Sequence, residues 1–244
     1  MQLQDILYSQ GWGIRRVCSG LVQQGWVEVC VDGEMRRITD STLDLDPEGL
    51  KFRVQGVDWE YHEKGYVLLY KPAGTECSQK PSAHPSIYSL LPMPLRQRPN
   101  KNAIQGLQAV GRLDQDTTGL LLLSDDGQFI HRMSSPKKHV SKVYRVTAKH
   151  AVTDQMVERL LAGVVLDDDP KPVRAAACVQ VDENTIDLTL TEGKYHQVKR
   201  MLAAVGNRVE GLHRWKIGGL ELPASMKSGQ WRWLTSADLE LLRP

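Results

Sequence analysis

The chain has 244 residues, of which 41% are hydrophobic and 25% charged, as in an ordinary globular protein. Its 31 Lys and Arg nearly balance its 29 Asp and Glu, which argues against a polycationic nucleic-acid coat and excludes an acidic disordered tail. The balance is uneven along the chain. Residues 132–149 carry six basic and no acidic side chains, and residues 192–232 carry eight and three. The rest of the chain is acidic or neutral. Residues 1–60 have a net charge of −4, and residues 150–191 have a net charge of −5.

The cysteines and the apolar runs limit the class of protein further. Cys18, Cys30, Cys77 and Cys178 form no Cys-x-x-Cys motif and are typical of reduced, packed thiols in a cytoplasmic protein. No metal site is expected. The first residues lack a basic region and a long apolar run, so no signal peptide is predicted. The longest aliphatic run, 120–123, is too short to span a bilayer, and we expect no membrane association.

The first sixty residues are predicted to form a separate domain. Apolar side chains at helical spacing predict a helix over 14–24, which Gly25 ends. Residues 26–31 alternate as in a strand, and Asp32-Gly33 is a hairpin signal. The polar stretch 56–64 lacks periodicity and is the expected linker.

After the linker, residues 65–244 are predicted to form one mixed domain of helices and strands. The Pro-rich stretch 92–102 is expected to be a loop without an assigned role. Further strands are predicted within 43–54 and at 66–70, 107–110, 120–123, 142–148, 176–181 and 185–191. Helices are predicted at 125–133, 153–163 and 195–206, and after the capping pattern of Thr235 and Asp238.

The common catalytic motifs are missing: there is no nucleophile elbow, phosphate-binding loop or dinucleotide-binding glycine pattern. One candidate is the polar turn 111–119, which holds Asp114 and Asp116 before an apolar strand. Such a turn can hold a carboxylate rigidly beside a pocket, or its Asp residues can simply bond their own backbone amides. The basic segments offer cations for phosphates and Tyr144 for stacking on a base, although they can equally be solvated faces.

Several of these stretches together resemble a known family. Lys71-Pro72-Ala73-Gly74, the turn 111–119, Lys142-Val143-Tyr144 and the run 192–201 occur as in pseudouridine synthases. The sequence most closely resembles the bacterial small-subunit rRNA enzymes of the RsuA type, over nearly the whole chain. The resemblance implies an α+β fold, with a small N-terminal α/β RNA-binding domain (1–60) and a catalytic domain (65–244). The catalytic domain is expected to have a mixed, mainly antiparallel sheet with flanking helices.

The resemblance also implies roles for individual residues. Asp114 would be the catalytic aspartate, Tyr144 the tyrosine that stacks on the uracil, and Lys199 the basic partner of Asp114. Arg112 would help to displace the target base, and Val198 would contact it, although Val198 also belongs to the apolar stripe of its helix. Further RNA contacts are expected from Lys142, Arg132, His196 and Arg200, and from Arg15 and Arg16 in the N-terminal domain.

The N-terminal domain resembles the S-four type of RNA-binding domain, with departures. The segments 13–16 and 25–29 and Asp32-Gly33 match that pattern. Gln2-Leu3-Gln4-Asp5 replaces the usual Arg-Leu-Asp-Lys opening, and Ile14 replaces a serine. Because this domain is acidic, we expect the main RNA contact surface on the catalytic domain.

The resemblance implies isomerisation of a uridine in 16S rRNA, with uridine 516 as the expected target. The reaction requires no cofactor. The alternatives are the same reaction on 23S rRNA and a non-catalytic RNA-binding or ribosome-assembly protein. A protein that only binds RNA does not need a catalytic carboxylate. The presence of Asp114 together with Tyr144 and Lys199 therefore argues against a non-catalytic protein. We expect a cytoplasmic protein that is a monomer. Its expected partner is small-subunit rRNA or an assembling small subunit.

Overall fold

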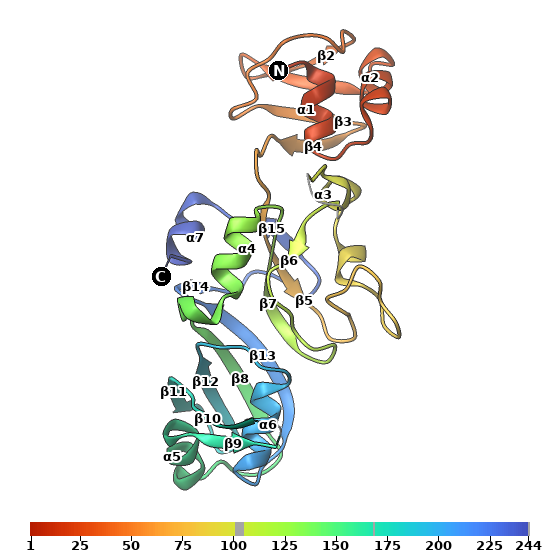
Figure 1. Cartoon of the computed structure of the whole chain (residues 1–244). Coiled ribbons are helices and arrows are strands. Elements are labelled where there is room, and N and C mark those ends of the chain that lie inside the picture. The colour runs from red at the N-terminus through yellow and green to blue at the C-terminus, as the bar shows by residue number, and fades with distance from the viewer. Residues whose placement is uncertain (101–104, 168, 244) are drawn as a thin grey trace. The chain divides into compact units, whose positions relative to one another are not determined.

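The computed structural model describes residues 1–100, 105–167 and 169–243 (Figure 1). The chain divides into two compact units. The first comprises Met1–Tyr66, Leu91–Gln108 and Ser124–Asp126, and the second Val67–Leu90, Ala109–Leu123 and Gly127–Pro244. Unit 1 therefore combines the N-terminal part of the chain with two short segments from its middle.

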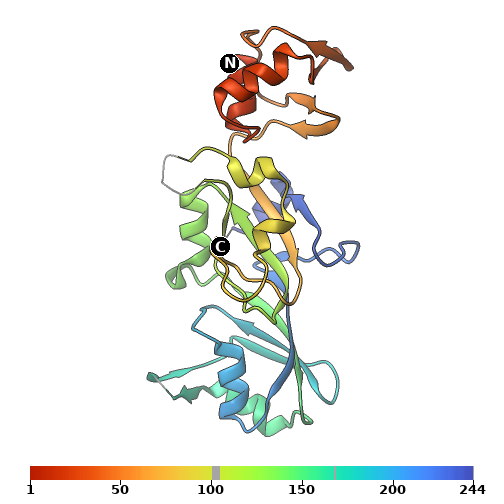
Figure 2. The ribbon, with the colours of Figure 1, turned by 90° about the vertical axis from the view of Figure 1, so that its right-hand side faces the viewer.

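The N-terminal part of unit 1 is a four-stranded antiparallel sheet in the order β2-β1-β3-β4. Figure 2 shows two helices on one side of these strands. The predicted hairpin is confirmed, since Asp32 and Gly33 have φ of 52° and 82°, as a type I′ turn requires. The elements are α1 (Leu3–Ser9), α2 (Arg15–Gln23), β1 (Val27–Val31), β2 (Glu34–Ile38), β3 (Lys51–Val54) and β4 (Val57–Glu60).

Two features of this part differ from the prediction. The expected linker over 56–64 is wrong in its first half, because Val57–Glu60 forms β4 and pairs with β3. Helix α1 was not predicted. Its buried Leu3, Ile6 and Leu7 have helical spacing, but seven residues are too short a window for periodicity to stand out.

A buried arginine joins the segments of unit 1. Helix α3 (Met93–Gln97) replaces part of the loop expected over 92–102, of which Lys101 and Asn102 lie outside the described residues. Arg98 follows this helix and is only 2% exposed. It donates to Asp125 Oδ2 at 2.6 Å, to Gln10 Oε1 at 3.0 Å and to the His62 carbonyl at 2.8 Å. One guanidinium thus holds together three sequence-distant segments.

Unit 2 is built on a nine-stranded sheet whose main path runs β11-β12-β8-β13-β7-β5-β15. Strand β13 pairs in parallel with β7 and antiparallel with β8, so the sheet is mixed and mainly antiparallel, as predicted. The strands are β5 (Tyr66–Lys71), β6 (Gln108–Ala109), β7 (Thr118–Ser124), β8 (Lys142–Ala148), β11 (Ala177–Gln180), β12 (Thr185–Leu190), β13 (Val209–Ile217), β14 (Leu220–Glu221) and β15 (Trp231–Trp233).

Helices and a small ribbon flank this sheet. The ribbon pairs β9 (Val164–Leu166) with β10 (Asp169–Val173), and the helices are α4 (Gly127–Ser134), α5 (Asp154–Ala162), α6 (Gln197–Ala204) and α7 (Ser236–Leu241). Two predicted caps are confirmed: Thr153 accepts from the Met156 amide, and Thr235 and Asp238 form a capping box. No helix in the described parts of the chain is long and apolar enough to cross a bilayer.

Candidate active site

A buried lysine binds the polar turn 111–119, and a glycine at its end allows the backbone to pack closely against a neighbouring strand. Lys71, at the end of β5, is fully buried and donates to the carbonyl oxygens of Gln115 and Thr117 at 3.3 and 2.9 Å. Gly119 has φ of 112°, and a Cβ there would collide with the Arg214 carbonyl oxygen on the parallel strand β13. The turn therefore presents its carboxylates from a fixed backbone.

Asp114 lies in this turn beside two basic side chains from the start of α6. Its Oδ2 is 3.4 Å from Lys199 Nζ, and its Oδ1 is 3.5 Å from His196 Nε2. His196 adopts a left-handed conformation with φ of 48°, so α6 begins at Gln197, two residues later than predicted. This conformation places the imidazole outside the helix, against the carboxylate.

Asp116, for which the sequence predicts no functional role, is the closer partner of Lys199. Its two carboxylate oxygens lie 2.7 and 2.8 Å from Lys199 Nζ. Partial burial alone raises the pKa of Asp116, but the hydrogen bond and charge of Lys199 outweigh it and lower that pKa below its ordinary value. The pKa of Lys199 is raised, because Asp116 and Asp114 outweigh the opposing effect of burial. This ion pair therefore stays charged at neutral pH.

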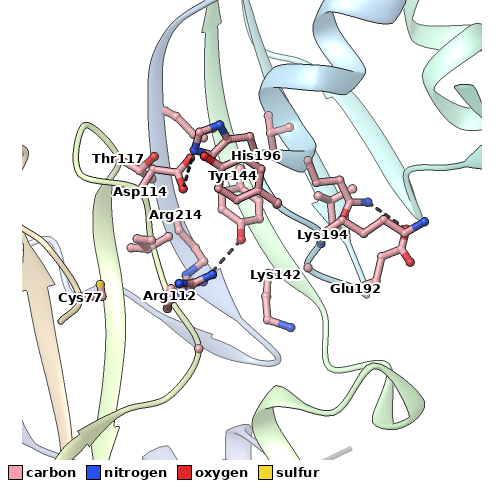
Figure 3. A pocket seen from close by; sticks show the side chains of 18 of the residues that line it. Cys77, Arg112, Asp114, Thr117, Lys142, Tyr144, Glu192, Lys194, His196 and Arg214 are labelled. Carbon is pink, nitrogen blue, oxygen red and sulfur yellow. Dashed lines mark hydrogen bonds and ion pairs between the residues drawn. The ribbon is translucent and has the colours of Figure 1, made fainter. Parts of the chain in front are cut away.

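A cavity of about 740 Å³ opens beside Asp114 and is lined entirely by unit 2. Its size suits a nucleotide. Figure 3 shows labelled side chains converging on it from the turn before β7, from β8 and β13, and from the segment before α6. Seven residues predicted from the sequence line it: Arg112, Asp114, Lys142, Tyr144, His196, Val198 and Lys199.

The other predicted RNA-binding residues lie elsewhere. Arg132 stacks over the Phe129 ring of its own helix, and Arg200 donates to the Tyr195 carbonyl at 3.2 Å. Arg15 and Arg16 belong to α2 in unit 1, where Arg15 pairs with Asp5 at 2.8 Å. None of these four lines the cavity.

The cavity also contains a cation whose role the sequence did not indicate. Arg214, on β13, is 2% exposed and donates through Nη1 to the Tyr144 hydroxyl oxygen at 3.4 Å. Nothing in its neighbourhood along the chain shows that β13 pairs with β8 and brings Arg214 opposite Tyr144.

Comparison with known proteins decides the family. The sequence pattern of the RNA pseudouridylate synthase family matches residues 65–204, more than half of the chain. The chain belongs to this family. Ribosomal small subunit pseudouridine synthase A of Haemophilus influenzae is 39% identical over 214 residues, which cover 88% of each chain. Its counterpart in Escherichia coli strain K12 is 37% identical and covers 96% of this chain and 97% of the relative.

A solved structure described as a crystal structure of pseudouridylate synthase supports the same assignment. It is 33% identical, covers 99% of both chains and superposes with a TM-score of 0.66. Within this pseudouridine synthase, Asp114, Tyr144 and Lys199 all lie in the segment that the family pattern matches. Among the described residues, no group of His, Cys, Asp or Glu is arranged to hold a metal ion.

The ion pair with Asp116 leads to a prediction about the position of Lys199. In Asp116→Asn, Lys199 loses its shortest contact and turns to Asp114, where it occupies the carboxylate oxygens needed for reaction. We expect kcat of pseudouridine formation to fall roughly tenfold, about 1.4 kcal/mol in activation free energy, with KM nearly unchanged. Steady-state kinetics on labelled RNA measures both constants. A variant with unaltered kcat would show that Asp116 does not position Lys199.

Proposed function

We propose that this enzyme converts a specific uridine of small-subunit rRNA to pseudouridine, with Asp114 as the catalytic carboxylate. One observation carries the proposal: Asp114, 30% exposed, meets Lys199 in a nucleotide-sized cavity that Tyr144 also lines. The names of the relatives support a small-subunit target. Uridine 516 of 16S rRNA is the target that we propose.

The chemistry explains why these side chains suit the reaction. The bond from uracil N1 to ribose C1′ breaks, a bond from C5 to C1′ forms, and the C5 proton is lost while N1 gains one. Composition and oxidation state do not change, so no redox cofactor is needed. An ionised carboxylate can attack as a nucleophile or remove a proton. Lys199 supplies a positive charge 3.4 Å from Asp114 Oδ2, and His196 Nε2 lies 3.5 Å from Oδ1.

The target base must first leave its helical stack. Extrusion costs on the order of a few kcal/mol, and stacking on an aromatic ring returns about 1–3 kcal/mol per base. We propose that Tyr144 supplies this ring and that Arg112, which lines the same cavity, fills the vacated space. Phosphate contacts from the two basic segments supply the remaining affinity, so RNA binding should weaken steeply with salt. The N-terminal domain, acidic overall, serves as a secondary RNA contact on this monomeric cytoplasmic enzyme.

The direct test is tritium release from RNA labelled at uracil C5, because the C5 proton leaves during the reaction. The purified protein should release tritium from small-subunit rRNA or an assembling small subunit, and not from 23S rRNA. Mapping of pseudouridines in a strain lacking the protein should show one site missing from 16S rRNA. A site missing from 23S rRNA instead would contradict the proposed target. Tight RNA binding without any modified base would indicate a non-catalytic binding protein.

A further inference from the structure

One end of the cavity holds a buried guanidinium that is incompletely bonded. Arg214 donates from Nε to the Leu120 carbonyl at 2.9 Å and from Nη1 to the Tyr144 hydroxyl. Its Nη2 is buried and has no hydrogen-bond partner among the described residues. A buried charged donor without a partner costs free energy, so a ligand atom that fills this position is bound favourably.

A second cation lies at the same end. Lys142 precedes Tyr144 by two residues on β8, which puts both side chains on one face of the sheet. Lys142 donates to the Val140 carbonyl at 3.1 Å. Burial, reinforced by the charge of Arg214, lowers the pKa of Lys142 to about 8. Lys142 and Arg214 both line the cavity, and Arg214 lies opposite Tyr144 on the neighbouring strand β13.

Neither cation is neutralised by the protein. Within the described parts of the chain, Arg214 and Lys142 have no carboxylate within salt-bridge distance. The other fully buried arginine, Arg98, has Asp125 at 2.6 Å. Two uncompensated like charges beside a cavity are unfavourable in the empty site and favour an oxygen that carries negative charge.

The arrangement around Tyr144 indicates which oxygen this is. In Figure 3 the Tyr144 hydroxyl points toward Arg214 and away from the Asp114–His196 pair. The carboxylate and the two cations thus lie toward different ends of the tyrosine ring. In uracil, the 4-carbonyl lies across the ring from N1, the atom bonded to ribose. A uracil stacked on Tyr144 with its ribose bond at Asp114 therefore directs O4 toward the cations.

We propose that Arg214 and Lys142 form a cationic subsite for O4 of the target uracil and stabilise the negative charge that develops there. This inference rests on the proposed function. When the N1–C1′ bond breaks, its electron pair remains on the base and is shared among N1, O2 and O4. Formation of the C5–C1′ bond consumes that pair, after which C5 loses its proton and N1 gains one. Attack of a carboxylate on ring carbon C6 also places charge on O4, so the subsite serves either route.

The test measures the single-turnover rate and the Kd for RNA separately in the variants Lys142→Met and Arg214→Met. Loss of a donor to a developing anion typically costs about 10²–10³ in rate. We expect the single-turnover rate to fall roughly 10²-fold in Arg214→Met and about tenfold in Lys142→Met. The Kd for RNA should stay within about twofold, with an unchanged slope of log K against log salt concentration. Arg159→Met is the control, because Arg159 also donates to a main-chain carbonyl but lies outside the cavity.

Stability measurements keep the test valid if Arg214→Met does not fold. Because the pKa of Lys142 falls from 10.5 to about 8 on folding, its charged form disfavours the folded state at pH 7. Lys142→Met should therefore unfold thermally at the wild-type temperature or above, while its chemical step is slower. A folded Lys142→Met with the wild-type single-turnover rate would overturn the subsite.

An RNA phosphate is the competing source of a negatively charged oxygen. A phosphate contact would weaken RNA binding in Lys142→Met and reduce the salt slope by about one without slowing the bound complex, and this result would overturn the assignment to O4. Failure of the wild-type protein to release tritium from any RNA would overturn the proposed function itself. An active wild-type enzyme with an unaffected variant would overturn only the subsite.

Discussion

Replacing Asp114 with Asn is expected to lower the rate of pseudouridine formation by at least about 10³-fold. Asn has the same shape, and the hydrogen bond from the Thr117 amide to the main-chain carbonyl of residue 114 does not depend on the side chain. The turn should therefore keep its conformation. What is lost is the negative charge that attacks the substrate or takes up a proton. Tritium release under single-turnover conditions measures this loss.

The second carboxylate of the same turn provides a matched control. Asp116→Asn removes an equal charge two residues away, and its expected effect is only about tenfold. RNA binding should be nearly the same for the wild type and both variants, because neither carboxylate neutralises a phosphate. A rate for Asp114→Asn within tenfold of the wild type would contradict a catalytic role for this residue. Equal losses in the two variants would indicate that the turn needs both charges for its structure.

Replacing Arg98 with Met is expected to destabilise unit 1 by about 3–5 kcal/mol in free energy of unfolding. Asp125, 11% exposed, keeps a hydrogen bond from the Gly65 amide but loses its buried cation. Gln10 and the His62 carbonyl lose donors as well. Urea unfolding followed by hydrogen exchange measures the loss and assigns it to the segments of unit 1.

An exposed arginine in the same unit serves as the control. Arg53 pairs with Asp58 at 2.7 Å and with Glu28 at 3.3 Å, at positions open to solvent. Such pairs contribute about 0–1 kcal/mol, so Arg53→Met should have little effect. The double variant Arg98→Met with Asp125→Asn should recover part of the stability, because no buried charge is then left unpaired. Similar small losses in Arg98→Met and Arg53→Met would show that the Arg98 network does not hold unit 1 together.

Local structure was predictable where neighbouring residues decide it. The Asp32-Gly33 hairpin, the Thr153 cap and the capping box at Thr235 depend on bonds that span a few residues, and all three are present. Strand β8 begins and ends where its alternation predicted. The failures are also local in origin. Helix α1 is short, and His196 takes a left-handed conformation that periodicity cannot reveal.

The order of amino acids, with the family resemblance, was enough to name Asp114, Tyr144 and Lys199 as candidate catalytic residues and to predict the mixed sheet. Only the tertiary structure decides which side chains come into contact. Lys199 lies closest to Asp116, Arg214 donates to the Tyr144 hydroxyl, and Arg98 forms an ion pair with Asp125. The first two pairs are 83 and 70 positions apart in the chain. Their distances depend on strand pairing and on the backbone at the start of α6. Propensity and periodicity describe neighbours along the chain and contain no information about such contacts.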